Sequence, residues 1–239
     1  TCCFIHDAKE ESVNTILEMA EYKKTGTCKI LIVTGCMAQR YKEEITEEIP
    51  EVDAVLGTTS YGDIVKALNE AEAGHVFQEF KDINALPEDS GRRVITTGGH
   101  FGYLKIAEGC DKHCTYCIIP SLRGKFRSVP EERLLKQAEY MASQGVRELI
   151  LVAQETTVYG TDLYGKKTLH ILLKKLCQIK GIRWIRVLYC YPEEIYDELI
   201  QVMKEEKKIC HYLDLPIQHV SDRIDRKSTR LNSSHLVIS

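Results

Sequence analysis

Apolar residues in the first third of the chain alternate between the spacing of amphipathic helices and the short continuous runs of buried strands. Val13, Ile16 and Ala20 are separated by three and four residues, which places them on one face of a helix. The pattern predicts helices over residues 8–22, 38–48 and 61–73 and strands over residues 29–34 and 52–56. Strands and helices that alternate in this way form a small parallel sheet covered by helices.

The same alternation resumes near residue 100 and continues for more than a hundred residues. Strands are predicted over residues 103–107, 149–152, 184–188 and 212–215, and helices near residues 130–145, 167–179 and 193–206. Parallel strands joined by crossover helices fit part of a (β/α) barrel as well as an open sheet. The expected fold class is therefore α/β, with a small N-terminal parallel domain followed by a partial barrel.

Three changes in pattern divide the chain. Periodicity lapses over residues 75–99, where glycine, proline and charged residues accumulate, so this range is predicted to connect a domain over residues 1–74 with a core over residues 100–225. Residues 226–239 are rich in serine, have no period, and are set aside as a non-native tail. Because the chain opens inside a motif and without Met, we expect a fragment that lacks the start of the first domain and the end of the core, and that does not complete full turnover.

Composition narrows the function classes. The 239 residues contain no run of about 18 apolar residues and no secretion signal, so a cytoplasmic protein without a membrane partner is predicted. Ten cysteines are more than such a protein needs for packing, and disulfides are not expected in a reducing compartment. Metal or redox chemistry is therefore the leading interpretation, while a net charge of −3 gives no general reason to bind nucleic acid.

The central feature is the array C-x3-C-x2-C formed by Cys110, Cys114 and Cys117, which follows a predicted strand. Three thiolates bind three irons of a 4Fe-4S cluster and leave the fourth iron open to a small ligand. Zinc is an alternative, but a closed zinc site needs a fourth donor and only His113 lies nearby in the sequence. Inert buried thiols are the other alternative.

This spacing, with Tyr116 at the aromatic position before the last cysteine, resembles the radical S-adenosylmethionine (radical SAM) enzymes. The resemblance implies that S-adenosylmethionine binds the open iron and is cleaved to a 5'-deoxyadenosyl radical. Tyr116 then belongs to the cofactor site. Gln154 and Glu155 end a predicted barrel strand, where they are candidates to contact the cofactor's amino group or ribose, with an ordinary polar pair at a strand end as the alternative.

Residues around the array, including Arg123-Gly124 and Arg127-Ser128, are similar to those of the methylthiotransferase family within this class. The segments Thr1-Cys2-Cys3-Phe4-Ile5 and Thr34-Gly35-Cys36-Met37-Ala38-Gln39 also resemble that family. The resemblance implies a second 4Fe-4S cluster bound by Cys2 and Cys36, with the third ligand expected upstream of Thr1. Spacing alone would favour core thiols at these two positions.

Two short segments, residues 153–160 and 189–192, are similar to the methylthiotransferases that modify an aspartate of small ribosomal subunit protein twelve. That protein is then the substrate, and an electron donor protein is a further partner. One alternative is a transfer-RNA adenosine methylthiotransferase, which would bind nucleic acid; another is a non-catalytic iron-sulfur carrier, although carriers usually supply a fourth cysteine. Weaker site candidates are Arg127, Arg186, Gln218 and His219, and buried thiols are predicted at Cys3, Cys28, Cys177, Cys190 and Cys210.

Overall fold

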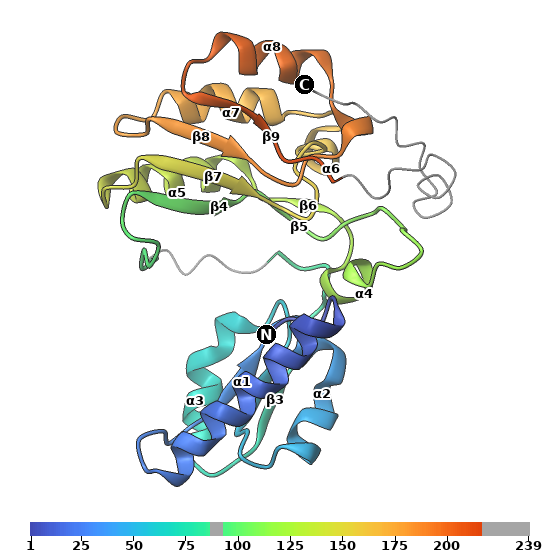
Figure 1. The fold of residues 1–239 in the computed structure, drawn as a ribbon, viewed down its shortest axis with the longest axis vertical. Coiled ribbons are helices and arrows are strands. Elements are labelled where there is room, and N and C mark those ends of the chain that lie inside the picture. Colours follow the sequence, from blue (N-terminus) through green and yellow to red (C-terminus); the bar gives the residue numbers. More distant parts are fainter. Residues whose placement is uncertain (87–92, 217–239) are drawn as a thin grey trace. The chain divides into compact units, whose positions relative to one another are not determined.

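Two separate parallel sheets organise the chain in the computed structural model, which describes residues 1–86 and 93–216 (Figure 1). Packing divides these residues into two compact units. Unit 1 contains residues 1–86 together with Cys117–Gly124, and unit 2 contains residues 93–116 together with residues 125–216. The fold is α/β, as the sequence predicts.

Unit 1 is built on a sheet with strand order β1-β2-β3, all parallel. Its elements are α1 (His6–Lys24), β1 (Ile32–Thr34), α2 (Cys36–Glu48), β2 (Ala54–Leu56), a 3-10 turn η1 (Tyr61–Asp63), α3 (Ile64–Glu72), β3 (Phe77–Glu79) and α4 (Ile119–Arg123). Every residue of the central strand β2 is buried, because helices and neighbouring strands enclose it. The short helix α4 joins this core through Leu122, which is 5% exposed and whose carbonyl accepts a hydrogen bond of 2.9 Å from the Thr58 hydroxyl.

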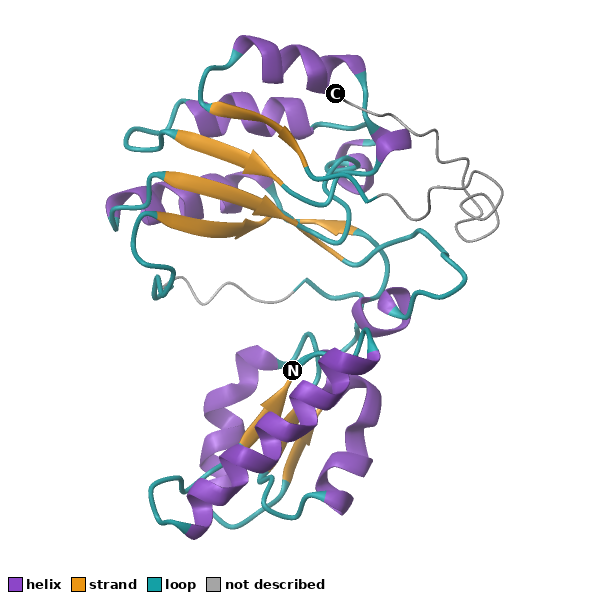
Figure 2. Cartoon of the chain, in the orientation of Figure 1, coloured by secondary structure: helices purple, strands orange, loops and turns teal. Residues whose placement is uncertain are grey.

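Unit 2 is built on a four-stranded parallel sheet with the order β4-β7-β8-β9. Its elements are β4 (Phe101–Lys105), β5 (Ala107–Glu108), β6 (Arg127–Ser128), α5 (Glu131–Ser143), β7 (Glu148–Val152), α6 (Thr161–Tyr164), α7 (Leu169–Cys177), β8 (Trp184–Val187), a 3-10 turn η2 (Pro192–Glu194), α8 (Asp197–Glu205) and β9 (Ile209–Leu213). A helix lies between successive strands of this sheet, as a crossover between parallel strands requires (Figure 2).

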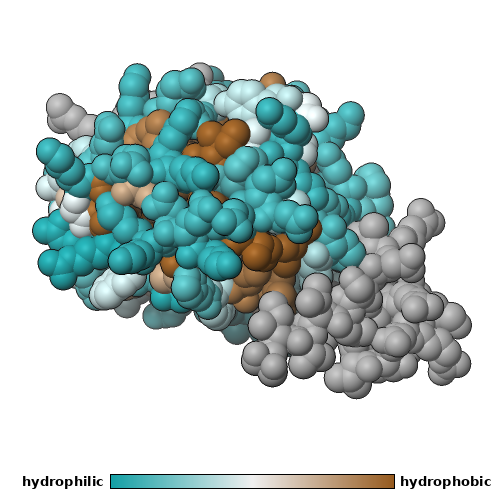
Figure 3. Space-filling model, turned by 90° about the horizontal axis from the view of Figure 1, so that it is seen from above, coloured by the Kyte–Doolittle hydropathy of each residue, from teal (hydrophilic) through white to brown (hydrophobic). Residues whose placement is uncertain are grey.

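One face of this sheet carries the core. Leu104, Leu149 and Val187 alternate with more exposed neighbours and pack with the apolar stripes of α5, α7 and α8. On the opposite face, Tyr103 and Trp184 are exposed. The view in Figure 3 shows mostly hydrophilic side chains with separated apolar patches between them. None of the helices in the two described ranges has the length and apolarity needed to span a membrane.

The structure differs from the sequence pattern mainly in short elements. β3 lies within residues 75–99, where the pattern predicted no element, and its three residues are too few to show a period. The last described strand covers Ile209–Leu213 instead of residues 212–215, because Ile209 is buried and pairs with Ile185. The helix predicted near residues 193–206 is divided into η2 and α8.

A partly buried group of hydrogen bonds fixes the chain where α6 begins. The Asp162 carboxylate accepts hydrogen bonds from the backbone N–H (2.8 Å) and the hydroxyl (2.6 Å) of Ser128, and the Ser128 oxygen accepts the N–H of Gly160 at 2.8 Å. Ser128 is fully buried, whereas Asp162 is exposed at the start of α6. This group ties β6 to the loop that follows β7.

Asp162→Ala is expected to lower the free energy of unfolding by about 1–3 kcal/mol, because it leaves the buried donors of Ser128 without an acceptor. Urea denaturation followed by circular dichroism measures the loss. Glu139→Ala, which removes an exposed carboxylate from α5 in the same unit, is the control and should change stability by less than about 0.5 kcal/mol. Equal effects of the two substitutions would contradict the prediction.

Candidate functional site

The loop that carries Cys110 and Cys114 follows β5, and hydrogen bonds from backbone N–H groups to side-chain oxygens hold it in place. The N–H of Gly109 donates to the Gln154 side-chain oxygen at 2.8 Å, and the Asp111 carboxylate accepts the N–H of Phe126 at 3.0 Å. Gln154 follows the end of β7, so one loop beyond a strand end holds the cysteine loop. The structure thus gives the amide oxygen of Gln154 a contact with the protein backbone.

The three thiols of the array are reduced and half-buried. Cys110 Sγ accepts the backbone N–H of Lys112 at 3.4 Å. The phenol of Tyr191 lies within hydrogen-bonding reach of the Cys114 thiol. Burial raises the pKa of Tyr191, and the neighbouring Cys114 thiol raises it further. Hydrogen bonds to cysteine sulfur are one means by which proteins tune iron-sulfur clusters.

Within residues 1–86 and 93–216, no three His, Cys, Asp or Glu side chains lie close enough together to hold a metal ion. The fit of the array to an iron-sulfur cluster therefore rests on donor type. Thiols are soft ligands that suit iron-sulfur clusters, whereas hard cations take oxygen ligands. Half-burial also keeps Cys110, Cys114 and Cys117 within reach of an incoming metal.

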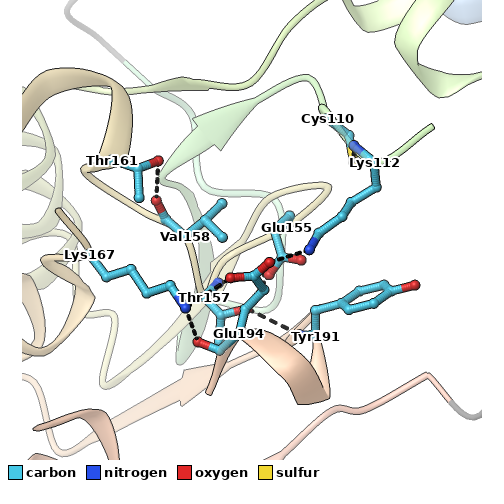
Figure 4. Close-up of polar contacts among 9 residues, drawn as sticks. All are labelled: Cys110, Lys112, Glu155, Thr157, Val158, Thr161, Lys167, Tyr191 and Glu194. Carbon is cyan, nitrogen blue, oxygen red and sulfur yellow. Dashed lines mark hydrogen bonds and ion pairs between the residues drawn. The ribbon is translucent and has the colours of Figure 1, made fainter. Parts of the chain in front are cut away.

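Glu155 is a buried carboxyl group beside this loop (Figure 4). It is 2% exposed, and its Oε1 atom accepts hydrogen bonds from the backbone N–H (3.1 Å) and the hydroxyl of Thr157. Burial raises its pKa to about 7, against the opposing effects of the Thr157 hydrogen bonds and the Lys112 charge. Its Oε2 atom is buried and has no hydrogen-bond partner in the described part of the chain. Such an atom is a natural acceptor for a ligand's ammonium or hydroxyl group.

The residues after Glu155 fasten two strand-end loops together. The Thr156 hydroxyl donates to the Leu188 carbonyl at 2.8 Å, and the Thr157 hydroxyl oxygen accepts the N–H of Tyr191 at 3.1 Å. Both threonines are fully buried. Hydrogen bonds therefore join the loops that follow β7 and β8, and these loops lie next to the cysteine loop.

Unit 1 brings together the two segments that carry Cys2 and Cys36. The Thr1 amino group donates to the Thr34 carbonyl at 2.9 Å, and the N–H of Cys36 donates to the Thr1 carbonyl at 3.1 Å. Gly35 permits this approach, since its φ is +109° and a Cβ there would lie 2.7 Å from the Thr1 carbonyl oxygen. Cys36 is the first residue of α2, and its sulfur accepts a hydrogen bond of 3.1 Å from the Arg123 guanidinium.

The other site candidates have different outcomes. Tyr116 is 57% exposed. Arg127 donates to the Lys125 carbonyl, and Arg186 forms an ion pair of 2.8 Å with Glu148 across two strands. Gln218 and His219 lie outside the described residues.

Of the predicted buried thiols, Cys3, Cys177 and Cys190 are buried, whereas Cys28 and Cys210 are half-buried, so the prediction was wrong for those two. Cys28 lies in the connection before β1, and Cys210 lies on β9, which has a strand on one side only among the described residues.

Sequence reasoning missed several residues that contact the predicted cysteines: Lys112 through its backbone N–H, and Tyr191 and Arg123 through their side chains. Lys112 lies within the cysteine array and Tyr191 within residues 189–192, so their positions in these motifs could have marked them as site residues. Arg123 is also in such a motif, but nothing in the sequence links it to Cys36, 87 residues away.

Comparison with known proteins gives the class. The model of the radical SAM superfamily matches residues 104–236, and that of "Uncharacterized protein family UPF0004" matches residues 1–57. The chain belongs to the radical SAM superfamily.

Its relatives include proteins with the name "Ribosomal protein uS12 methylthiotransferase RimO". That of Lachnoclostridium phytofermentans is 66% identical over 238 residues, covering 99% of this chain and 54% of that protein. That of Clostridium botulinum (strain Eklund 17B / Type B) is 54% identical over 226 residues, covering 94% and 50%. The chain spans about half the length of the curated relatives it matches.

Two solved structures share the fold. The cobalamin-dependent S-adenosylmethionine radical enzyme OxsB has a TM-score of 0.57 and 16% identity, and the match covers 94% of this chain and 36% of that one. The radical S-adenosylmethionine methyltransferase TsrM from Kitasatospora setae has a TM-score of 0.55 and 12% identity, with 91% and 54% covered. At these identities the likeness concerns the fold alone.

The raised pKa of Glu155 predicts a pH-dependent stability. The carboxyl binds its proton more tightly in the folded chain, where its pKa is about 7, than in the unfolded chain, where it is near 4.5. Its contribution to stability is therefore fully present below about pH 4.5 and is lost as the pH rises through 7. Glu155→Gln should leave the free energy of unfolding nearly unchanged at pH 4.5 and raise it by up to about 3 kcal/mol at pH 8.

Urea denaturation at the two pH values measures this difference. Glu139→Gln, which removes the charge of an exposed residue in α5, should show no such pH dependence. A Glu155→Gln variant that is less stable than the parent at pH 8 would mean that the carboxylate is compensated in the folded chain.

Proposed function

We propose that this chain carries the cofactor-binding part of a radical SAM methylthiotransferase that adds a methylthio group to the β-carbon of an aspartate in ribosomal protein uS12. The observation that carries the proposal is the C-x3-C-x2-C loop held at the ends of parallel strands, in a chain 66% identical to a uS12 methylthiotransferase over 238 residues. An electron donor protein and a cytoplasmic location belong to the same proposal.

Two 4Fe-4S clusters and S-adenosylmethionine are the proposed cofactors. Cys110, Cys114 and Cys117 would hold one cluster, and Cys2 and Cys36 would contribute to the second. When bound, the first cluster and S-adenosylmethionine supply a 5'-deoxyadenosyl radical able to remove the hydrogen from the aspartate β-carbon. The proposed domains are residues 1–74, a connection over 75–99, a radical SAM core over 100–225 and a non-native tail from 226.

The residues around Glu155 support this assignment. Its buried Oε2 atom can accept a hydrogen bond from the cofactor's amino group or ribose. Gln154 would act by holding the cysteine loop through Gly109, and Tyr116 would line the cofactor from its exposed position. Burial beside the strand ends also excludes water, which protects a reactive radical.

Cys114→Ala is expected to abolish reductant-dependent formation of 5'-deoxyadenosine, because two thiolates hold a 4Fe-4S cluster poorly. The assay follows anaerobic reconstitution with iron and sulfide and detects the product by chromatography. Cys28→Ala is the matched control, since Cys28 is another half-buried thiol but lies outside the array. Product formation that survives in the Cys114 variant would overturn the radical SAM assignment of the array.

The substrate can be tested by competition. A reconstituted protein that carries these residues within a chain of the relatives' full length, offered uS12 and unmodified transfer RNA together, is expected to place the methylthio group on the aspartate, as detected by mass spectrometry of peptides and nucleosides. The absence of a general positive charge in this chain agrees with a protein substrate. Modified adenosine without modified aspartate would establish the transfer-RNA alternative.

A further inference from the structure

Lys112 lies between the first two cysteines of the array. Its ammonium group contacts a carboxylate in the loop that follows β8. Its ammonium group forms an ion pair with Glu194, the last residue of η2, and lies 4.8 Å from the ring centroid of Tyr191. The side chains of Lys112 and Glu194 are only 16% and 24% exposed. An ion pair this shielded from water is screened less than a surface pair.

A second lysine completes the arrangement. Lys167, which precedes α7, places its Nζ atom 2.8 Å from Oε2 of Glu194 and also donates to the Glu194 carbonyl at 2.8 Å. Each carboxylate oxygen of Glu194 thus has its own ammonium partner (Figure 4). We name these three residues, Lys112, Glu194 and Lys167, the carboxylate clamp.

The clamp adds a further contact to the stretch between Cys110 and Cys114. In that stretch Asp111 binds the backbone of Phe126, whereas Lys112 reaches the loop after β8 through Glu194. Glu155 lies close enough to Lys112 that the lysine charge opposes part of the rise in the Glu155 pKa that burial causes. The position of Lys112 therefore relates the cysteine loop to the buried carboxyl group.

We infer that Glu194 is a positioning residue, which acts through Lys112 to hold the cysteine loop at a fixed place over the strand-end loops. This inference rests on the proposed function, because the loop is useful in this way only if it holds the cluster. Loss of the clamp leaves the thiols and Glu155 present but allows their separation to vary. Misplacement of reacting groups by about 1 Å costs up to about a hundredfold in rate.

The test is a double-mutant cycle with Lys112→Met, Glu194→Gln and both together in the reconstituted protein. Each single substitution is expected to lower kcat for 5'-deoxyadenosine formation by about tenfold or more, with a smaller change in KM for S-adenosylmethionine. The double variant should be no worse than the more affected single variant, because both remove one interaction. Lys112→Arg should restore part of the rate. The exposed pair Lys174 and Glu205, 3.9 Å apart, provides the control cycle and should be additive with little loss.

Trypsin gives a readout that needs no cluster. In the metal-free protein, Glu194→Gln should speed cleavage after Lys112 severalfold, because the ammonium group is no longer held, whereas Glu205→Gln should not. Coupled kinetic effects with faster cleavage support the inference. Additive effects, or unchanged cleavage after Lys112, in a parent protein that forms 5'-deoxyadenosine would overturn the inference and leave the proposed function standing. A parent protein that forms no 5'-deoxyadenosine would overturn the proposed function, and the inference with it.

Discussion

The attachment of the cysteine loop to the ends of the parallel strands is the constraint on which the candidate site depends. Parallel strands end at one edge of a sheet, so the loops after β7 and β8 meet there. The chain after β4 joins them through β5, which pairs antiparallel with β6, and through the bond from Gly109 to Gln154. Gln154 uses that proximity to bind the backbone before Cys110, and Thr157 joins the next loop through Tyr191. The sheet of unit 2 therefore positions the segment with Cys110 and Cys114 through hydrogen bonds between loops.

This arrangement has an energetic cost at Glu155. A carboxyl group that is 2% exposed and titrates near pH 7 destabilises the folded chain once it ionises. Two hydrogen bonds from Thr157 and the charge of Lys112 offset only part of that cost, and Oε2 receives none of the hydrogen bonds. The geometry is nevertheless held, because Thr156 and Thr157 are bonded to the β8 loop independently of the charge on Glu155. Buried groups of this kind are common where a protein binds a ligand or performs chemistry.

The apolar pattern predicted α5, α7 and α8 well because each of these helices buries a stripe against one core, which leaves a 3.6-residue period in the sequence. The pattern did not predict β3 and α4, because elements of three and five residues are too short for a repeat of apolar positions to be recognised. The site was predictable to the extent that its residues share a motif, as Cys110 and Cys114 do. Arg123 and Glu194 were not predictable, because their partners are distant in sequence and contact depends on how loops meet.

A shared backbone device presents the cysteines in both units. Cys36 and Cys110 each follow a glycine with positive φ, +109° at Gly35 and +78° at Gly109. Residues with a Cβ rarely adopt such values, so the chain can turn sharply just before the thiol. At Gly35 the turn brings the Thr1 carbonyl within hydrogen-bonding distance of Cys36, and at Gly109 it accompanies the bond to Gln154. Each thiol is thus placed by the backbone that precedes it, although the two Gly-Cys pairs belong to different sheets.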